Sequence, residues 1–259
     1  MSSRHWNSTP RHGAVVARSR TPAPLILHGN DVSCRVQHWS FQPQTAQLVL
    51  YHQQGLPTLR DLSHWTDRLT ELGYTRVRTT ALAAPAALRV ESAGFRSIQE
   101  LVLLEHTDPR HPRRSDTVAT TPVTPTQRMV AAQHAAASDI DVAAFTEDWS
   151  LETQAIGDVC AATPRFRARS AGEPMSAYAI TGRDANQGFL QRLAVQPEHQ
   201  RAGLGRALVL DSLRWLGRWR VQRVLVNTPV DNFPALALYE RMGFRRMSDR
   251  LRVYELVVQ

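Results

Sequence analysis

A turn containing two glycines, over residues 200–206, has the clearest chemical meaning in this sequence. It reads Gln-Arg-Ala-Gly-Leu-Gly-Arg, follows the apolar run 189–195 and opens a helix-like run over 207–219. The first N–H groups of a helix lack partners within the helix, and the helix dipole favours negative charge there. Gly203 and Gly205 let a bulky ligand approach the backbone without meeting a Cβ atom. The turn is therefore predicted to bind an anion, for which a pyrophosphate is the natural candidate.

Two other phosphate-binding motifs do not fit this turn. A Walker loop needs Gly-Lys-Ser/Thr, and the chain contains no lysine. A dinucleotide fingerprint needs a third glycine and an acidic residue at the end of the next strand. Here position 208 is Leu, and the strand-like run 223–226 is followed by Asn227. The cationic donors on either side of the turn are Arg201 and Arg206.

A second segment, residues 232–244, reads as a short capped helix. Asn232 is a good N-cap residue, Pro234 fits the first turn, and Gly243 is placed to follow the helix in a left-handed conformation. Together the two segments resemble the GCN5-related N-acetyltransferase (GNAT) superfamily, whose cofactor loop reads Gln/Arg-x-x-Gly-x-Gly/Ala and whose later helix reads Asn-x-x-Ala-x-x-Leu-Tyr-x-x-x-Gly-Phe. Every fixed position is present: Gln200, Gly203, Gly205, Asn232, Ala235, Leu238, Tyr239, Gly243 and Phe244.

The resemblance covers residues 127–259 and implies an α/β (α+β) fold with helices flanking a central mixed, mostly antiparallel sheet. It implies acetyl-CoA as co-substrate, an amine acceptor and no metal. A free strand edge would bind the pantetheine amides and offer an N–H to the acetyl carbonyl, as in an oxyanion hole. Tyr239 would protonate the leaving thiolate, because a phenol with a pKa near 10 is normally protonated. The implied cofactor-binding residues are Leu193, Ala194, Val195, Gln200, Arg201, Ala202, Gly203, Leu204, Gly205, Arg206 and Asn232.

The general base is where the sequence departs from the family pattern. Many relatives carry a glutamate at the position of Gln191, and the ribosomal-protein N-terminal acetyltransferases carry one at the position of Asn227. Neither amide accepts a proton usefully. The remaining candidates are a water chain or one of three carboxylates in the helices expected to frame the acceptor: Glu147, Asp148 and Glu152.

The lack of a glutamate at positions 191 and 227 limits how basic the acceptor amine can be. An α-amine with a pKa near 8 is roughly a tenth neutral at pH 7, whereas a lysine amine near 10.4 is neutral in well under a thousandth. The difference corresponds to about 3–4 kcal/mol of deprotonation. A site without a dedicated base is therefore expected to use an α-amine of a peptide, an amino acid or a small metabolite.

Composition fits an ordinary globular protein of 259 residues, with 42% hydrophobic and 21% charged residues. No apolar run is long enough to span a membrane, and two cysteines, Cys34 and Cys160, make no disulfide framework, so a cytoplasmic location is expected. The net charge of +8 comes from arginine alone, which suits a GC-rich bacterial genome. Residues 1–127 hold 14 Arg and 9 acidic residues (+5) and residues 128–259 hold 17 and 14 (+3), so the excess is spread along the chain.

The chain divides into four predicted parts: a disordered tail over 1–24, a folded region over 25–106, a Pro- and Thr-rich linker over 107–127, and the catalytic domain over 128–259. A shift of 149 residues places 77–96 on 226–245 with eight of twenty positions identical. The N-terminal region is therefore interpreted as a partial copy of the same fold. It looks degenerate, because its best candidate phosphate loop, 53–57, has Pro57 in place of the second glycine, and proline has no N–H.

Periodicity predicts the elements of the catalytic domain. They are strands over 129–132, 166–169, 176–180, 189–195, 223–227 and 250–257, and helices over 139–146, 151–162, 204–219 and 233–242.

Two functions other than catalysis remain open. The fold could bind acyl-CoA as a sensor without transferring the acyl group, or the arginine-rich chain could bind nucleic acid, which salt-dependent retention on DNA would test. The acyl chain length is not predicted, and either a monomer or a homodimer is compatible with the sequence.

Overall fold

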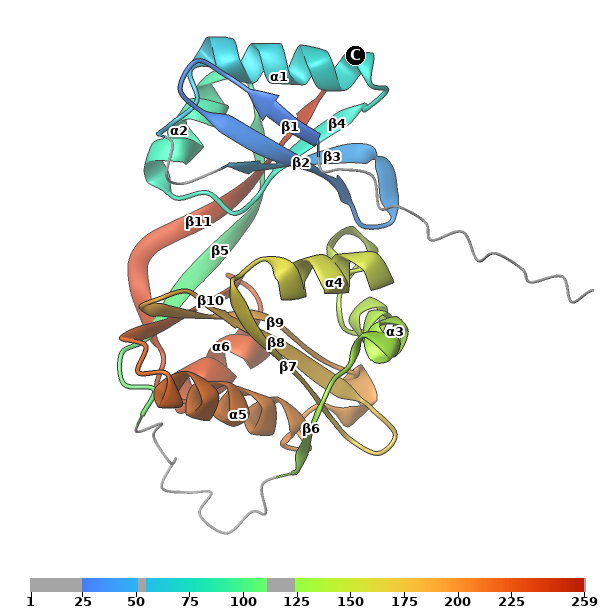
Figure 1. The fold of residues 1–259 in the computed structure, drawn as a ribbon, viewed down its shortest axis with the longest axis vertical. Helices are drawn as coiled ribbons and strands as arrows, with labels where there is room; N and C mark the ends of the chain where they lie inside the picture. The colour runs from blue at the N-terminus through green and yellow to red at the C-terminus, as the bar shows by residue number, and fades with distance from the viewer. Residues whose placement is uncertain (1–24, 51–54, 111–123, 259) are drawn as a thin grey trace, which may run out of the picture.

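The computed structural model describes residues 25–50, 55–110 and 124–258. The tail 1–24, the first two residues of the candidate loop 53–57 and most of the predicted linker lie outside the described residues. Eleven strands of the described part form one sheet, in the order β1-β2-β3-β4-β11-β5-β10-β9-β8-β7-β6 (Figure 1). The sheet is mixed and mostly antiparallel, and helices flank it, as the resemblance implies.

The N-terminal half comprises β1 Leu25–His28, β2 Ser33–Trp39, β3 Gln42–Leu50, α1 Leu59–Glu71, β4 Arg76–Thr79, α2 Ala84–Ser92 and β5 Arg96–His106. The C-terminal half begins with β6 Thr126–Arg128, the 3-10 helix η1 Ala131–Gln133, α3 His134–Ala144, the 3-10 helix η2 Glu147–Trp149 and α4 Thr153–Ala161. It continues with β7 Arg165–Ala171, β8 Ala177–Arg183, β9 Gln187–Val195, the 3-10 helix η3 Pro197–His199, α5 Leu204–Arg218, β10 Arg223–Pro229, α6 Phe233–Arg241 and β11 Arg245–Val257.

Three predicted element starts in the C-terminal half differ from the structure by three residues or more. The first strand is Thr126–Arg128 rather than 129–132, because the Gln133 side chain accepts from the Val130 N–H (3.0 Å) and starts a helical turn there. Helix α3 consequently begins at His134, five residues before the prediction. Strand β11 begins at Arg245 rather than 250, because its first residues pair with β5, a partner that the local pattern does not reveal.

The two halves exchange their last strands. β5 leaves the N-terminal half and lies between β10 and β11, pairing antiparallel with both. β11 in turn leaves the C-terminal half, and its end at Glu255–Val257 pairs with β4. Figure 1 shows both strands crossing between the halves. The repeated units of the sequence, β4-α2-β5 and β10-α6-β11, therefore occupy equivalent places in the sheet. The sheet runs through both halves without a break, and the division of the chain into two domains by a linker at 107–127 stays a prediction.

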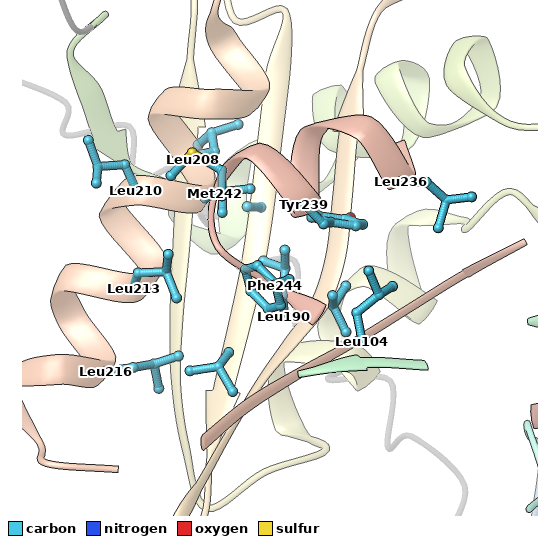
Figure 2. Packing of buried hydrophobic residues seen from close by; sticks show 14 of the residues in the cluster. Leu104, Leu190, Leu208, Leu210, Leu213, Leu216, Leu236, Tyr239, Met242 and Phe244 are labelled. Atoms are coloured by element: carbon cyan, nitrogen blue, oxygen red, sulfur yellow. The ribbon is translucent and has the colours of Figure 1, made fainter. Parts of the chain in front are cut away.

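The hydrophobic cores follow this exchange. Tyr254 of β11 is fully buried in the core of the N-terminal half, and Leu104 of β5 is fully buried in the core of the C-terminal half (Figure 2). Helices α5 and α6 cover that second core on one face of the sheet. Helices α3 and α4 cover a third core on the opposite face, beneath β7 to β9. Burial of each half therefore depends on a strand from the other.

No helix in the described part is both long and apolar enough to cross a membrane.

Candidate active site

Strands β9 and β10 run parallel but separate after three residue pairs. β10 pairs with β9 only from Arg223 to Leu225, opposite Gln187 to Phe189. On its other side β9 stays paired with β8 as far as Val195, with a register shift that leaves Gln191 as a bulge. Within the described residues, the β10-facing edge of Leu193, Ala194 and Val195 is therefore unpaired. The split between β9 and β10 offers backbone groups to an extended ligand.

The double-glycine turn brings an uncapped helix end to the mouth of this split. Gly203 is the N-cap of α5 with φ +87°, a left-handed conformation that favours glycine, and no side chain caps the helix. Helical hydrogen bonding begins with the Ala207 N–H to the Gly203 carbonyl (2.9 Å). An added Cβ at Gly203 would meet nothing within 4 Å, so the space beside it is open. Gln200 donates to the Val195 carbonyl (3.4 Å) and joins the turn to the end of β9.

The second glycine of the turn, Gly205, also has a packing role. An added Cβ at Gly205 would lie 3.3 Å from Leu238 Cδ2 and 3.7 Å from Val195 Cγ2. The small residue therefore lets α5 pack closely against α6 and β9, and its predicted contact with a ligand stays a prediction. The contact lies in the second half of α6, and Asn232 caps the N-terminus of that helix by accepting from the Ala235 N–H (3.2 Å). A cofactor contact by Asn232 stays a prediction.

Tyr239 lies on α6 and faces the sheet beside Leu190 and Phe244 (Figure 2). The residue is 5% exposed, and its ring centroid lies 5.7 Å from that of Phe244. Its hydroxyl makes no hydrogen bond to any described group. Burial raises the pKa of Tyr239 above its ordinary value, and the positive charge of Arg192 offsets part of this increase. The phenol is therefore protonated over the whole physiological range of pH.

A buried charged cluster lies under β9 on the opposite face, and sequence reasoning missed it. Asp141 of α3 is fully buried and pairs through both oxygens with Arg192 of β9 (2.9 and 2.5 Å). Asp141 also accepts from the Tyr178 hydroxyl and from the Leu151 N–H (2.7 Å). Arg192 also lies over the Phe145 ring, 3.7 Å from its centroid. An acidic residue in a helix and an arginine in a strand ordinarily indicate solvent-facing positions, so the pattern gave no signal.

The five candidate positions for a general base lie on several elements of the fold. Gln191 turns its amide toward α4, where Nε2 donates to the Val159 carbonyl (3.2 Å). Asn227 is exposed on β10, on the face opposite the α5–α6 core. Asp148 accepts from Gln42 of the N-terminal half (2.5 Å) and lies 3.6 Å from Arg78. Glu152 is the N-cap residue of α4, and the side chain of Glu147 lies outside the described part. These positions do not assign Glu147, Asp148 or Glu152 as the general base.

The equivalent helix N-terminus in the N-terminal half, that of α1, is capped by side chains of the chain itself. Thr58 accepts from the Asp61 N–H (3.2 Å), and the Asp61 carboxylate accepts from the Thr58 N–H (2.9 Å). Asp61 also accepts from the Asn30 N–H (3.1 Å) and is buried. A carboxylate therefore already occupies the α1 N-terminus, the place that a phosphate would need in the described part of this loop.

Replacing Asp61 with Asn is expected to destabilise the protein by about 1–2 kcal/mol at pH 7, since charged hydrogen bonds at the helix end are lost. Hydrogen bonds from Thr58 lower the pKa of Asp61 below its ordinary 3.8. The stabilisation by the charged carboxylate is therefore complete above the unfolded pKa and is lost as the pH falls through the folded pKa. Urea unfolding between pH 7 and pH 2 should show a constant difference above the ordinary pKa of 3.8 and a shrinking difference below it. A difference that stays constant over the whole range would contradict this assignment.

Among the described residues, no group of three or more His, Cys, Asp or Glu side chains is arranged to hold a metal ion.

Residues 134–244 match the family model described as Acetyltransferase (GNAT) family. The ribosomal protein bS18-alanine N-acetyltransferase of Escherichia coli K12 is 36% identical over 80 residues, 31% of this chain and 54% of that protein. The mycothiol acetyltransferase of Acidothermus cellulolyticus is 45% identical over 53 residues, 20% of this chain and 16% of that protein. The chain thus spans about half the length of the first of these relatives and less of the second.

Two solved structures share the fold over most of the chain. A tandem GNAT protein from the clavulanic acid biosynthesis pathway gives a TM-score of 0.62 at 16% identity, covering 87% of this chain and 78% of that one. A GCN5-related N-acetyltransferase from Kribbella flavida gives 0.58 at 12% identity, covering 89% of both chains. At these identities the likeness concerns the fold, and the first of them supports the tandem arrangement.

Proposed function

We propose that this chain, whose residues 134–244 form a GNAT-family acetyltransferase domain, transfers an acetyl group from acetyl-CoA to an α-amine. The observation that carries the proposal is the uncapped α5 N-terminus at the mouth of the β9–β10 split, with Gly203 left-handed beside open space. The main-chain N–H groups of residues 204–206 would bind the pyrophosphate, helped by Arg201 and Arg206. The pantetheine would extend along Leu193–Val195.

The chemistry proposed for the split is direct attack of the amine on the thioester carbonyl. A backbone N–H of the β9 edge would stabilise the oxyanion that develops on the carbonyl oxygen. As the carbon–sulfur bond breaks, the Tyr239 phenol would donate its proton to the thiolate, and the attacking amine would lose one to solvent. A buried, protonated phenol without another hydrogen-bond partner suits this role.

The kind of amine that accepts the acetyl group is inferred from Gln191 and Asn227, the two amides at positions where relatives carry a carboxylate. Gln191 is turned toward α4, and Asn227 does not accept protons, so the amine must reach the site unprotonated. An α-amine meets this condition about 3 kcal/mol more easily than a lysine side chain. The name of the Escherichia coli relative, an alanine N-acetyltransferase of a ribosomal protein, agrees with an α-amine acceptor.

A binding experiment tests the cofactor site. Acetyl-CoA should stabilise the protein in thermal shift, and Gly203→Val should weaken its binding at least tenfold by calorimetry, since a β-branched residue resists the left-handed conformation. Gly73→Val is the matched control, because Gly73 has the same φ of +87° and the same open surroundings but follows α1, far along the chain. Equal losses of acetyl-CoA affinity in both variants would contradict the proposal that acetyl-CoA binds at the Gly203 turn.

Thiol release over a panel of amines tests the reaction. N-terminal amines should react faster than lysine side chains, and the opposite order would exclude the acceptor class. Glu105 of β5 is half-buried on the same face of the sheet as Asn227, so Glu105→Gln is an informative variant. A large loss of kcat in Glu105→Gln, with the acidic limb of the pH profile gone, would show that a carboxylate base exists after all.

A non-catalytic acyl-CoA sensor is the second candidate function, and the same two amides favour it. Acetyl-CoA binding at the turn without thiol release for any amine would select the sensor.

A further inference from the structure

The degenerate half contacts the C-terminal half at the loop between α3 and α4. Trp39 at the end of β2 donates from Nε1 to the Asp148 carbonyl (2.7 Å), and Gln42 of β3 donates to the Asp148 carboxylate (2.5 Å). The Trp39 ring also meets the edge of Trp149, with centroids 5.3 Å apart. Two adjacent residues of the loop are thus held by the other half of the chain.

The opposite side of this loop is bound to the charged cluster beside the β9 bulge. Arg192 donates to the Trp149 carbonyl (2.8 Å), and the Leu151 N–H donates to Asp141 (2.7 Å). Ser138 of α3 donates to the Leu151 carbonyl (2.9 Å). The loop therefore lies between the N-terminal half and the Asp141–Arg192 pair. Arg192 directly precedes Leu193, the first residue of the β9 edge that β10 leaves unpaired.

The exchanged strand fixes Trp39 in turn. Arg78 of β4 lies over the Trp39 ring, with its guanidinium carbon 4.8 Å from the centroid. Its Nε pairs with Glu255 of β11 (2.6 Å), and Arg78 is only 5% exposed. A cleft of about 160 Å³ opens at the same joint, with Trp39, Trp149 and Leu151 among the residues that line it.

We propose that the degenerate half positions the acceptor-side loop of the active half. Trp39 and Gln42 hold residues 148–151 against Asp141 and Arg192, which keeps this pair dry and in place on the side of the split opposite α5 and α6. The inference rests on the proposed function for its catalytic consequence. It assigns Trp39 as a positioning residue, since it acts through the loop and not on the reacting atoms.

Trp39→Phe in the full chain tests the assignment, because Phe keeps an aromatic ring beside Trp149 but lacks the Nε1 donor. Hydrogen exchange at the Leu151 amide should rise at least about fivefold, the loss expected for one hydrogen bond. The KM for the amine should rise severalfold while the acetyl-CoA Kd stays unchanged. Gln42→Glu, which sets a carboxylate against Asp148, should have a larger effect in the same direction.

Trp219→Phe is the control, since Trp219 is 54% exposed and contacts Arg183, away from the loop. It should change none of these values. Unaltered Leu151 exchange in both Trp39→Phe and Gln42→Glu would overturn the proposal, and so would a parallel loss of acetyl-CoA affinity. If the wild-type chain releases no thiol with any amine, the proposed function fails, while Leu151 exchange still decides whether the degenerate half holds the loop.

Discussion

Tyr239→Phe is expected to lower the turnover number of acetyl transfer by about 10²–10³-fold and to leave the Kd of acetyl-CoA unchanged. The substitution removes only the hydroxyl from a ring that is packed against Phe244 and is 5% exposed. Because that hydroxyl has no hydrogen-bond partner among the described residues, the thiolate would lose its proton donor without any loss of packing. Single-turnover thiol release and calorimetric titration with acetyl-CoA measure the two quantities separately.

Stability and pH dependence separate a chemical effect of Tyr239→Phe from a structural one. The variant should unfold at nearly the same temperature as the wild type, because the hydroxyl that is removed makes no hydrogen bond to a described residue. Since burial raises the pKa of Tyr239 above its ordinary 10, the wild-type turnover should not fall with deprotonation of this phenol below about pH 10.

Tyr74→Phe is the matched control for this experiment. Tyr74 lies in the N-terminal half, where its hydroxyl meets His38 Nδ1 (3.2 Å), so turnover should change less than about twofold. Equal effects of the two substitutions, or a Tyr239→Phe variant with full turnover, would remove Tyr239 from the reaction.

The parts of the site that local chemistry specifies could be predicted from the sequence. The residue that follows a helix in a left-handed conformation is usually glycine, and Gly243, predicted to fill this place, has φ +94°. The sequence also predicts Asn232 as an N-cap, and it accepts from the Ala235 N–H as a cap does. The strand–helix–strand repeat also showed in the sequence, because equivalent turns and core positions need similar residues at the same spacing.

The strand exchange could not be predicted, because alternation along a strand reports which face is buried and not which strand lies beside it. Val102 and Leu104 read equally well as core of either half, yet both lie in the core of the C-terminal half. The same limit applies to Asp141 and Arg192, which are 51 residues apart in sequence and hydrogen-bonded in the fold. The sequence makes Asp148 a candidate base, but its partners Gln42 and Arg78 come from the other half.

Asp141→Ala is expected to destabilise the protein by about 2–4 kcal/mol, because it leaves the Arg192 guanidinium, whose side chain is only 18% exposed, without its charged partner. The Tyr178 hydroxyl and the Leu151 N–H also lose the fully buried carboxylate that accepts their hydrogen bonds. Urea unfolding measures the loss, and Glu71→Ala, which breaks the exposed pair with Arg68, should cost under about 0.5 kcal/mol as a control. Removing both charges in Asp141→Leu with Arg192→Met should recover much of the stability, since the uncompensated charge is gone. A double variant no more stable than Asp141→Ala would place the cost in lost packing and backbone bonds instead.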